Sequence, residues 1–182
     1  TAMGASPKQQ EAAQQIPSAA KFGFAEPETV SSPYASARSS NMRVKKTFSD
    51  ADRERFLEDS FAFISRFFEN SLQELAGRNP GIEGRFRQID ANHFTCVIYA
   101  DGKAISRCKI VLGGAFGRGI SYSINDNGSD NSCNEKLSVE TDDQNLYLKP
   151  LMGLAFQSRR QNAKLSMEGA AELFWSILIE PL

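Results

Sequence analysis

The spacing of the apolar residues changes near residue 80, and this change restricts the chain to one class of fold. From Ser49 to about Ala76 the apolar side chains recur every three or four residues, as on one face of an α-helix. Beyond Ile82 they alternate with polar residues, which is the spacing of a β-strand with one buried face. The sequence therefore predicts a long helix followed by a sheet.

The predicted first helix has clear start and stop signals. Ser49 followed by Asp52 forms an acidic variant of a capping box, and Gly77 with Pro80 ends the helix. We call its apolar residues the aromatic stripe: Phe56, Leu57, Phe61, Ile64, Phe67, Phe68, Leu72 and Leu75. We expect this stripe to pack on the sheet, and a partner-binding face is the alternative interpretation.

Strand patterns follow one another from residue 82 to residue 148 without a helical crossover. Asp101-Gly102 separates two of them and is typical of a type I′ hairpin turn, in which both central residues need a positive φ. The other predicted strands lie at 85–89, 120–124, 137–139 and 145–148. Consecutive strands joined by short turns predict a mainly antiparallel sheet of five or six strands.

The hairpin turn also predicts a register for the strands on either side of it. With Asp101 and Gly102 at the turn, Ile98 lies opposite Ile105 and Cys96 lies opposite Arg107. Cys96 and Cys108 would then point to opposite faces of the sheet. We therefore expect all three cysteines to be free thiols, with Cys133 the most reactive in the native protein.

A second apolar helical pattern begins after Ser166 and ends before Pro181. The predicted fold class is therefore α+β. A long N-terminal helix and a C-terminal helix pack on a mainly antiparallel five- to six-stranded sheet, and residues 47–182 form a single domain.

Residues 1–46 differ in composition from the rest of the chain. Thr1 to Ser6 read as a cloning remnant, and the following residues are rich in Ala, Ser, Gln and Pro. This segment carries a net charge of +3, whereas residues 47–182 carry −4. We expect a disordered linker or tail, with the domain at the C-terminal end of a longer bacterial cytosolic protein.

Composition excludes several classes of function. A net charge of −1 and a pI near 5.9 leave no overall field that would attract nucleic acid, and the basic cluster around Arg159 and Arg160 lacks interleaved aromatic residues. The longest apolar run, near residues 174–179, is far shorter than the roughly 20 residues of a membrane span. Three cysteines without paired spacing favour a reducing, cytoplasmic compartment.

Motifs that would identify a cofactor are broken. The glycines from Gly113 to Gly119 resemble a phosphate-binding loop, but Ile120 stands where lysine is required and a strand pattern follows. The polar run from Ser123 to Asn134 lacks the acidic end ligands of a calcium loop. His93 is the only histidine, so sites with two histidine ligands are excluded. We expect no cofactor and no metal.

Polar side chains are concentrated between Gly113 and Tyr147, where loops on a rigid sheet would present them. The sequence therefore predicts a ligand-binding site that includes Arg118, Tyr122, Asn125, Asp126, Asn134, Glu135, Glu140 and Asp142. The leading hypothesis is a non-enzymatic binding or regulatory module that recognises a small polar ligand or a protein segment.

Two other classes of function remain open at this point. A carboxylate-based hydrolase or transferase would use Glu135, Glu140 and either Asp142 or Asp143, with Arg118 binding an anion. A chaperone-like or adaptor protein, as a homodimer, would expose the aromatic stripe to a partner. The sequence leaves catalysis uncertain and leans against it, because no nucleophile or metal motif is present.

Overall fold

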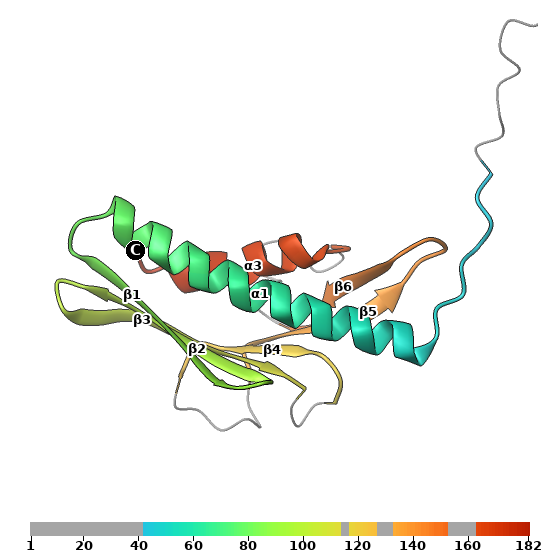
Figure 1. Ribbon diagram of the computed structural model, residues 1–182, viewed down its shortest axis with the longest axis horizontal. Helices are drawn as coiled ribbons and strands as arrows, with labels where there is room; N and C mark the ends of the chain where they lie inside the picture. The colour runs from blue at the N-terminus through green and yellow to red at the C-terminus, as the bar shows by residue number, and fades with distance from the viewer. Residues whose placement is uncertain (1–41, 114–116, 127–132, 153–162) are drawn as a thin grey trace, which may run out of the picture. The chain divides into compact units, whose positions relative to one another are not determined.

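The computed structural model describes residues 42–113, 117–126, 133–152 and 163–182. Within these residues the elements follow one another in the order helix, six strands, helix (Figure 1). They are α1 (Asp50–Arg78), β1 (Ile82–Asp90), β2 (His93–Ala100), β3 (Lys103–Leu112), β4 (Ile120–Ser123), β5 (Glu135–Thr141), β6 (Leu146–Pro150) and α3 (Met167–Ile179). The predicted α+β class is confirmed.

α1 begins where the capping signal predicts. The Ser49 hydroxyl accepts a hydrogen bond from the Asp52 backbone N–H at 3.2 Å, and the Asp52 carboxylate accepts one from the Ser49 N–H at 2.9 Å. These bonds satisfy two backbone donors that the first turn would otherwise leave unpaired. The Ser49 hydroxyl also donates to the Asp52 carboxylate at 2.7 Å, and this bond, with the one from the Ser49 N–H, holds the pKa of Asp52 below its ordinary value. At the other end, the Asn79 side chain donates to the Leu75 carbonyl at 2.8 Å.

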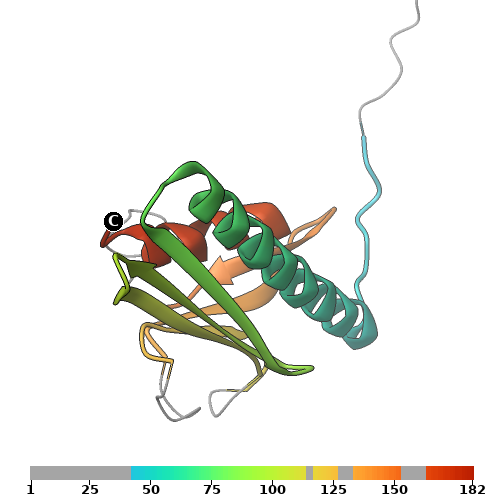
Figure 2. The same ribbon diagram turned by 60° about the vertical axis from the view of Figure 1, so that its left-hand side comes forward.

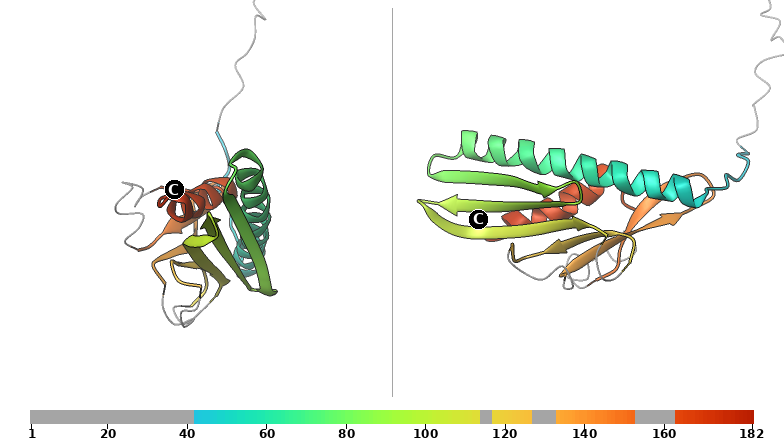
Figure 3. Two further views of the ribbon diagram at one scale, coloured as in Figure 1. Left: turned by 90° about the vertical axis from the view of Figure 1, so that its left-hand side faces the viewer. Right: turned by 60° about the horizontal axis from the view of Figure 1, so that its bottom comes forward.

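The six strands form one antiparallel sheet in which neighbours in sequence are neighbours in space (Figure 3). β1, β2 and β3 are the long strands, and β4 continues the sheet toward the shorter β5 and β6. Leu165, just before α3, exchanges two backbone hydrogen bonds with Leu148 at the β6 edge. The predicted meander of five or six strands is confirmed.

The predicted register between β2 and β3 is wrong by one residue. Asp101 and Gly102 have the expected positive φ values of 49° and 78°, and Ala100 pairs with Lys103 as predicted. A β-bulge then adds Ile105 to β3, because Ile98 pairs with Ser106 while Tyr99 pairs with Ala104. Every pair further along the strands is therefore shifted relative to the simple hairpin.

The bulge brings two cysteines face to face. Cys96 pairs with Cys108, and both side chains are fully buried and remain free thiols. Burial raises the pKa of the Cys96 thiol, and the neighbouring Cys108 raises it further. The prediction of free thiols is confirmed. The reason given for it, opposite faces of the sheet, is wrong, because the Cys96 and Cys108 side chains lie on the same face.

Both helices cover the same face of the sheet (Figure 2). The core between them contains the central residues of the aromatic stripe, the inward residues of the strands and the apolar side of α3. Phe68, for example, is fully buried, and its ring centroid lies 5.7 Å from that of Phe94 on β2 and 5.4 Å from that of Trp175 on α3. Packing of the aromatic stripe on the sheet is thus confirmed.

Residues 1–41 of the predicted linker or tail lie outside the described residues. The described residues before α1 run beside the turn between β5 and β6. The Lys46 N–H donates to the Asp143 carbonyl at 2.9 Å, and the Gln144 side chain donates to the Val44 carbonyl at 3.0 Å. These bonds position the chain immediately before α1 begins.

Candidate functional site

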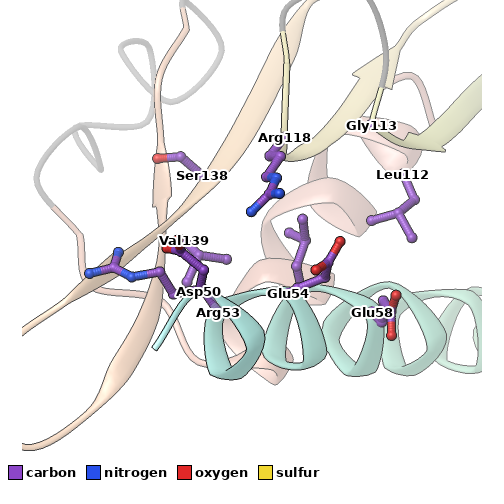
Figure 4. Close-up of a pocket in the computed structure, with 10 residues that line it drawn as sticks. Asp50, Arg53, Glu54, Glu58, Leu112, Gly113, Arg118, Ser138 and Val139 are labelled. Carbon is purple, nitrogen blue, oxygen red and sulfur yellow. The ribbon is translucent and has the colours of Figure 1, made fainter. Parts of the chain in front are cut away.

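A cleft of about 400 Å³ lies between the N-terminal half of α1 and the sheet (Figure 4). One wall comes from α1, and the other comes from the end of β3, the residues just before β4 and the middle of β5. The volume is within the range of known ligand pockets, roughly 300–1,000 Å³. Its lining residues are Asp50, Arg53, Glu54, Leu57, Glu58, Leu112, Gly113, Arg118, Ser138 and Val139.

The helix wall of the cleft follows from the spacing of residues along α1. Glu54, Leu57 and Glu58 are three and four residues apart, so they lie on one side of the helix. Leu57 is 7% exposed and belongs to the core, and Leu112 and Val139 pack against that core from the sheet. The cleft therefore has an apolar floor and three carboxylates on its helix wall, those of Asp50, Glu54 and Glu58.

Arg118 reaches the cleft from a glycine-rich bend between β3 and β4. The Gly113 N–H donates to the Gly119 carbonyl at 2.7 Å, which closes the bend just beyond the Leu112–Ile120 pair. A Cβ on Gly119 would lie 2.6 Å from the Leu137 carbonyl oxygen, so only glycine fits this close approach. The residues flanking Arg118 thus position it beside β5.

The charged side chains of the two cleft walls do not pair with each other. In the described part of the chain, Arg118, Glu54 and Glu58 make no hydrogen bond or ion pair with their side chains. Figure 4 shows Arg118 extending toward α1, where Glu54 and Glu58 lie. Arg53 is placed differently, because its guanidinium donates to the Thr141 hydroxyl at 3.4 Å. Opposite charges therefore face the cleft without neutralising one another directly.

Two of the predicted site residues lie inside the fold. Tyr122 is 1% exposed, and its ring centroid lies 5.1 Å from that of Phe174. Burial raises the pKa of its hydroxyl. Glu135 is fully buried, and its Oε1 accepts hydrogen bonds from the N–H groups of Lys136, Leu151 and Met152 at 2.9, 3.2 and 2.7 Å. Both side chains therefore have structural roles inside the fold.

Three further predicted residues lie around the residues that follow β4. Asp126 forms an ion pair with Arg107 on β3 at 3.1 Å. The Asn134 side chain accepts from the Ile124 N–H at 2.9 Å, which ties the start of β5 to the end of β4. Asn125 is exposed. None of the three lines the cleft that contains Arg118.

The last two predicted residues lie on β5 and just after it. Glu140 is partly exposed on β5. The Asp142 carboxylate accepts from the Gln144 and Asn145 N–H groups and from the Lys164 ammonium, at 2.8 to 2.9 Å. These bonds lower the pKa of Asp142 to about 2. Asp142 also lines a smaller hollow that shares Arg53 with the cleft. Of the eight predicted residues, the cleft therefore contains Arg118 alone.

Comparison with known proteins places the chain in a family. Residues 83–180, from β1 through α3, match the family described as the Y4lF protein domain. The chain belongs to this family. A relative in Sinorhizobium fredii, strain NGR234, which carries the name "Uncharacterized protein y4lF", is 50% identical over 146 residues. These residues make up 80% of the present chain and 45% of that relative, so the chain spans less than half of its length. No solved structure matches the chain.

The Y4lF match covers the sheet wall of the cleft and not its helix wall. Leu112, Arg118, Ser138 and Val139 lie within the matched residues, whereas the helix wall on α1 precedes them. The sheet wall is therefore part of the family domain, and α1 completes the cleft from outside the matched segment.

Other hollows lie beside α1 and α3 and carry both apolar and polar side chains. Phe63, Phe67 and Trp175 are half-buried and line shallow hollows beside α1 and α3. His93 hydrogen-bonds to the Asp90 carboxylate at 2.8 Å, and this contact lowers the pKa of Asp90. Within the described ranges, no group of three or more His, Cys, Asp or Glu side chains is placed to hold a metal ion. No helix among the described residues has the length and apolarity needed to cross a membrane.

Proposed function

We propose that the domain is a non-enzymatic binding module and that the cleft between α1 and the sheet binds a small polar ligand or a polar protein segment. The observation that carries this proposal is the unpaired set of opposite charges, Arg118 against Glu54 and Glu58, above the apolar floor of the cleft. Ligand pockets combine an apolar lining with a few polar groups that orient the ligand.

The placement of Glu135 and Asp142 does not favour the carboxylate-based enzyme that would use them. A carboxylate-based enzyme needs two carboxyl groups that share a substrate, one of them with an altered proton affinity. The Glu135 carboxylate accepts hydrogen bonds from backbone N–H groups. The Asp142 carboxylate accepts them from a backbone N–H of the turn after β5 and from the Lys164 ammonium. Neither carboxylate lines the cleft that contains Arg118.

An adaptor function would have to use a smaller surface than the aromatic stripe suggests. Phe61, Ile64, Phe68 and Leu72 are buried in the core, so they are not available to a partner in the folded domain. Contact with a second copy would rely on the half-buried Phe63, Phe67 and Trp175. We therefore favour ligand binding in the cleft over an adaptor function.

The proposal can be tested with a thermal-shift screen of amino acids, nucleotides, sugars and anions against three variants. A ligand at about 100 times its Kd stabilises a protein by roughly 2.7 kcal/mol. We expect Arg118→Ala to reduce the ligand-induced shift and Arg87→Ala to retain it in full, because Arg87 is also an exposed arginine and lies on β1, outside the lining of the cleft.

A third variant separates the cleft from the residues after β4. Asn125→Ala should retain the shift if the ligand binds in the cleft, and should lose it if the site lies beside Asn125 as the sequence alone suggests. A ligand-induced shift that is equal in wild type and Arg118→Ala would refute the cleft as the binding site.

A further inference from the structure

We infer that the cleft recognises an extended peptide segment in which an acidic residue stands next to a basic residue, with the acidic side chain against Arg118 and the basic side chain against Glu54 and Glu58. This inference rests on the proposed binding function and specifies its ligand. It follows from the charges on the two walls, from the length of the helix wall and from the geometry of an extended chain.

The helix wall favours a cation. Glu54 and Glu58 are one turn apart on α1, so their carboxylates flank the same stretch of the cleft. Arg53, the neighbouring cation, is engaged with Thr141 on β5. A lysine or arginine side chain of a ligand can therefore interact with two carboxylates whose charges no described side chain neutralises by an ion pair.

The sheet wall favours an anion. Arg118 extends into the cleft from the glycine bend and makes no ion pair with a described residue. A guanidinium presents N–H donors in a planar fork that matches both oxygens of a carboxylate. A carboxylate of the ligand can therefore bind at this wall.

A ligand of a single charge would fit only one of the two walls. An anion that pairs with Arg118 would bring like charge toward Glu54 and Glu58, and a cation that pairs with the glutamates would approach Arg118. Like charges brought together across an interface reduce affinity, whereas complementary charges fix the orientation of the ligand. A ligand with both charges satisfies both walls.

The length of the cleft favours a peptide over a free amino acid. Its helix wall runs from Asp50 to Glu58, which is about 12 Å at 1.5 Å per residue. An extended chain covers about 3.3 Å per residue, so three or four residues span this wall. Successive side chains of an extended chain point to opposite sides, so neighbouring acidic and basic residues would reach opposite walls.

The test uses the 182-residue chain labelled with ¹⁵N and two capped peptides as probes. The first is acetyl-Leu-Glu-Lys-Leu-amide, and the second is acetyl-Leu-Gln-Gln-Leu-amide, which has the same length without charges. We expect the charged peptide to shift the amide signals of Leu57, Leu112 and Val139, and to bind about fivefold or more tightly than the neutral peptide, as expected of partly exposed ion pairs.

Variants assign each charge to its wall. Arg118→Gln and the double variant Glu54→Gln/Glu58→Gln should each weaken binding of the charged peptide about fivefold. Neither should change binding of the neutral peptide. Glu69→Gln is the matched control, because Glu69 is an exposed glutamate of α1 beyond the cleft, and it should bind both peptides as the wild type does.

The possible failures can be distinguished. Equal binding of the two peptides, with shifts in the cleft, would overturn the charge assignment and leave the binding function standing. Binding of free leucine, which is a zwitterion, without binding of the charged peptide would overturn the peptide assignment. The absence of any signal change in the cleft with the peptides overturns the inference, whereas the proposed function fails separately if the thermal-shift screen finds no ligand that depends on Arg118.

Discussion

Gly84 on β1 should not tolerate a methyl group, because α1 lies directly against it. An ideal Cβ at this position would lie 2.9 Å from the Leu72 Cβ, 3.0 Å from the Leu72 Cδ2 and 3.0 Å from the Leu72 carbonyl oxygen. Carbon atoms in good contact are about 3.5–4.0 Å apart. The Leu72 side chain can rotate, but its backbone oxygen cannot, so α1 must move away from β1 by several tenths of an ångström.

We therefore expect Gly84→Ala to lower the free energy of unfolding by about 1–3 kcal/mol, the usual cost of overpacking. Urea unfolding followed by circular dichroism measures this change. Gly77→Ala is the control, because a Cβ at Gly77 meets no heavy atom within 4 Å and alanine favours a helix by up to about 1 kcal/mol. Both variants change the unfolded chain in the same way, so equal stabilities of the two variants would refute the argument.

Three other predictions concern the core, the thiols and the turn after β5. Phe68→Ala should lower the free energy of unfolding by about 3–5 kcal/mol, and Phe67→Ala should lower it clearly less, because of these two rings only that of Phe68 is fully buried. Equal losses would contradict the orientation of α1 in which Phe68 faces the core. A thiol reagent should modify Cys133 first and the two buried cysteines only on unfolding; equal rates would contradict their burial. Asp142, whose pKa falls to about 2 in the folded domain, should stabilise the fold fully above about pH 4 and lose this effect as the pH falls toward 2. Asp142→Asn should therefore flatten the dependence of Tm on pH in this interval, and an unchanged dependence would exclude the effect.

The sequence predicted those parts of the fold that local chemistry determines. Ser49 and Asp52 mark the start of α1 because their hydrogen bonds involve only the first turn. Asp101 and Gly102 mark the hairpin because a two-residue turn needs positive φ at both positions. The bulge at Ile105 has no such local signal in the turn residues. The register therefore could not be read from the turn alone.

The site was harder to predict, because polarity along the chain does not report burial. Tyr122 and Glu135 contributed to the polar density of the predicted region, yet Tyr122 packs in the core and Glu135 binds backbone N–H groups. Glu54 and Glu58 have the spacing of a solvated helix face, and they become site residues only because the glycine bend places Arg118 opposite them. That juxtaposition joins residues about 60 positions apart in the chain.

The close contact at Gly84 should also affect the cleft, because one rigid helix takes part in both. α1 contains 29 residues and is therefore roughly 40 Å long, with Leu72 near one end and the helix wall of the cleft near the other. A straight helix moved away from β1 at Leu72 must tilt or slide along its length, which changes the position of Glu54 and Glu58 relative to Arg118. We expect Gly84→Ala, under conditions where it is folded, to shift the amide signals of Leu57 and Val139 and to weaken binding of the charged peptide. Gly77→Ala should do neither, because it leaves the packing of α1 unchanged. Cleft signals that are identical in wild type and Gly84→Ala would mean that α1 bends locally at Leu72, and the two ends of the helix would then be independent.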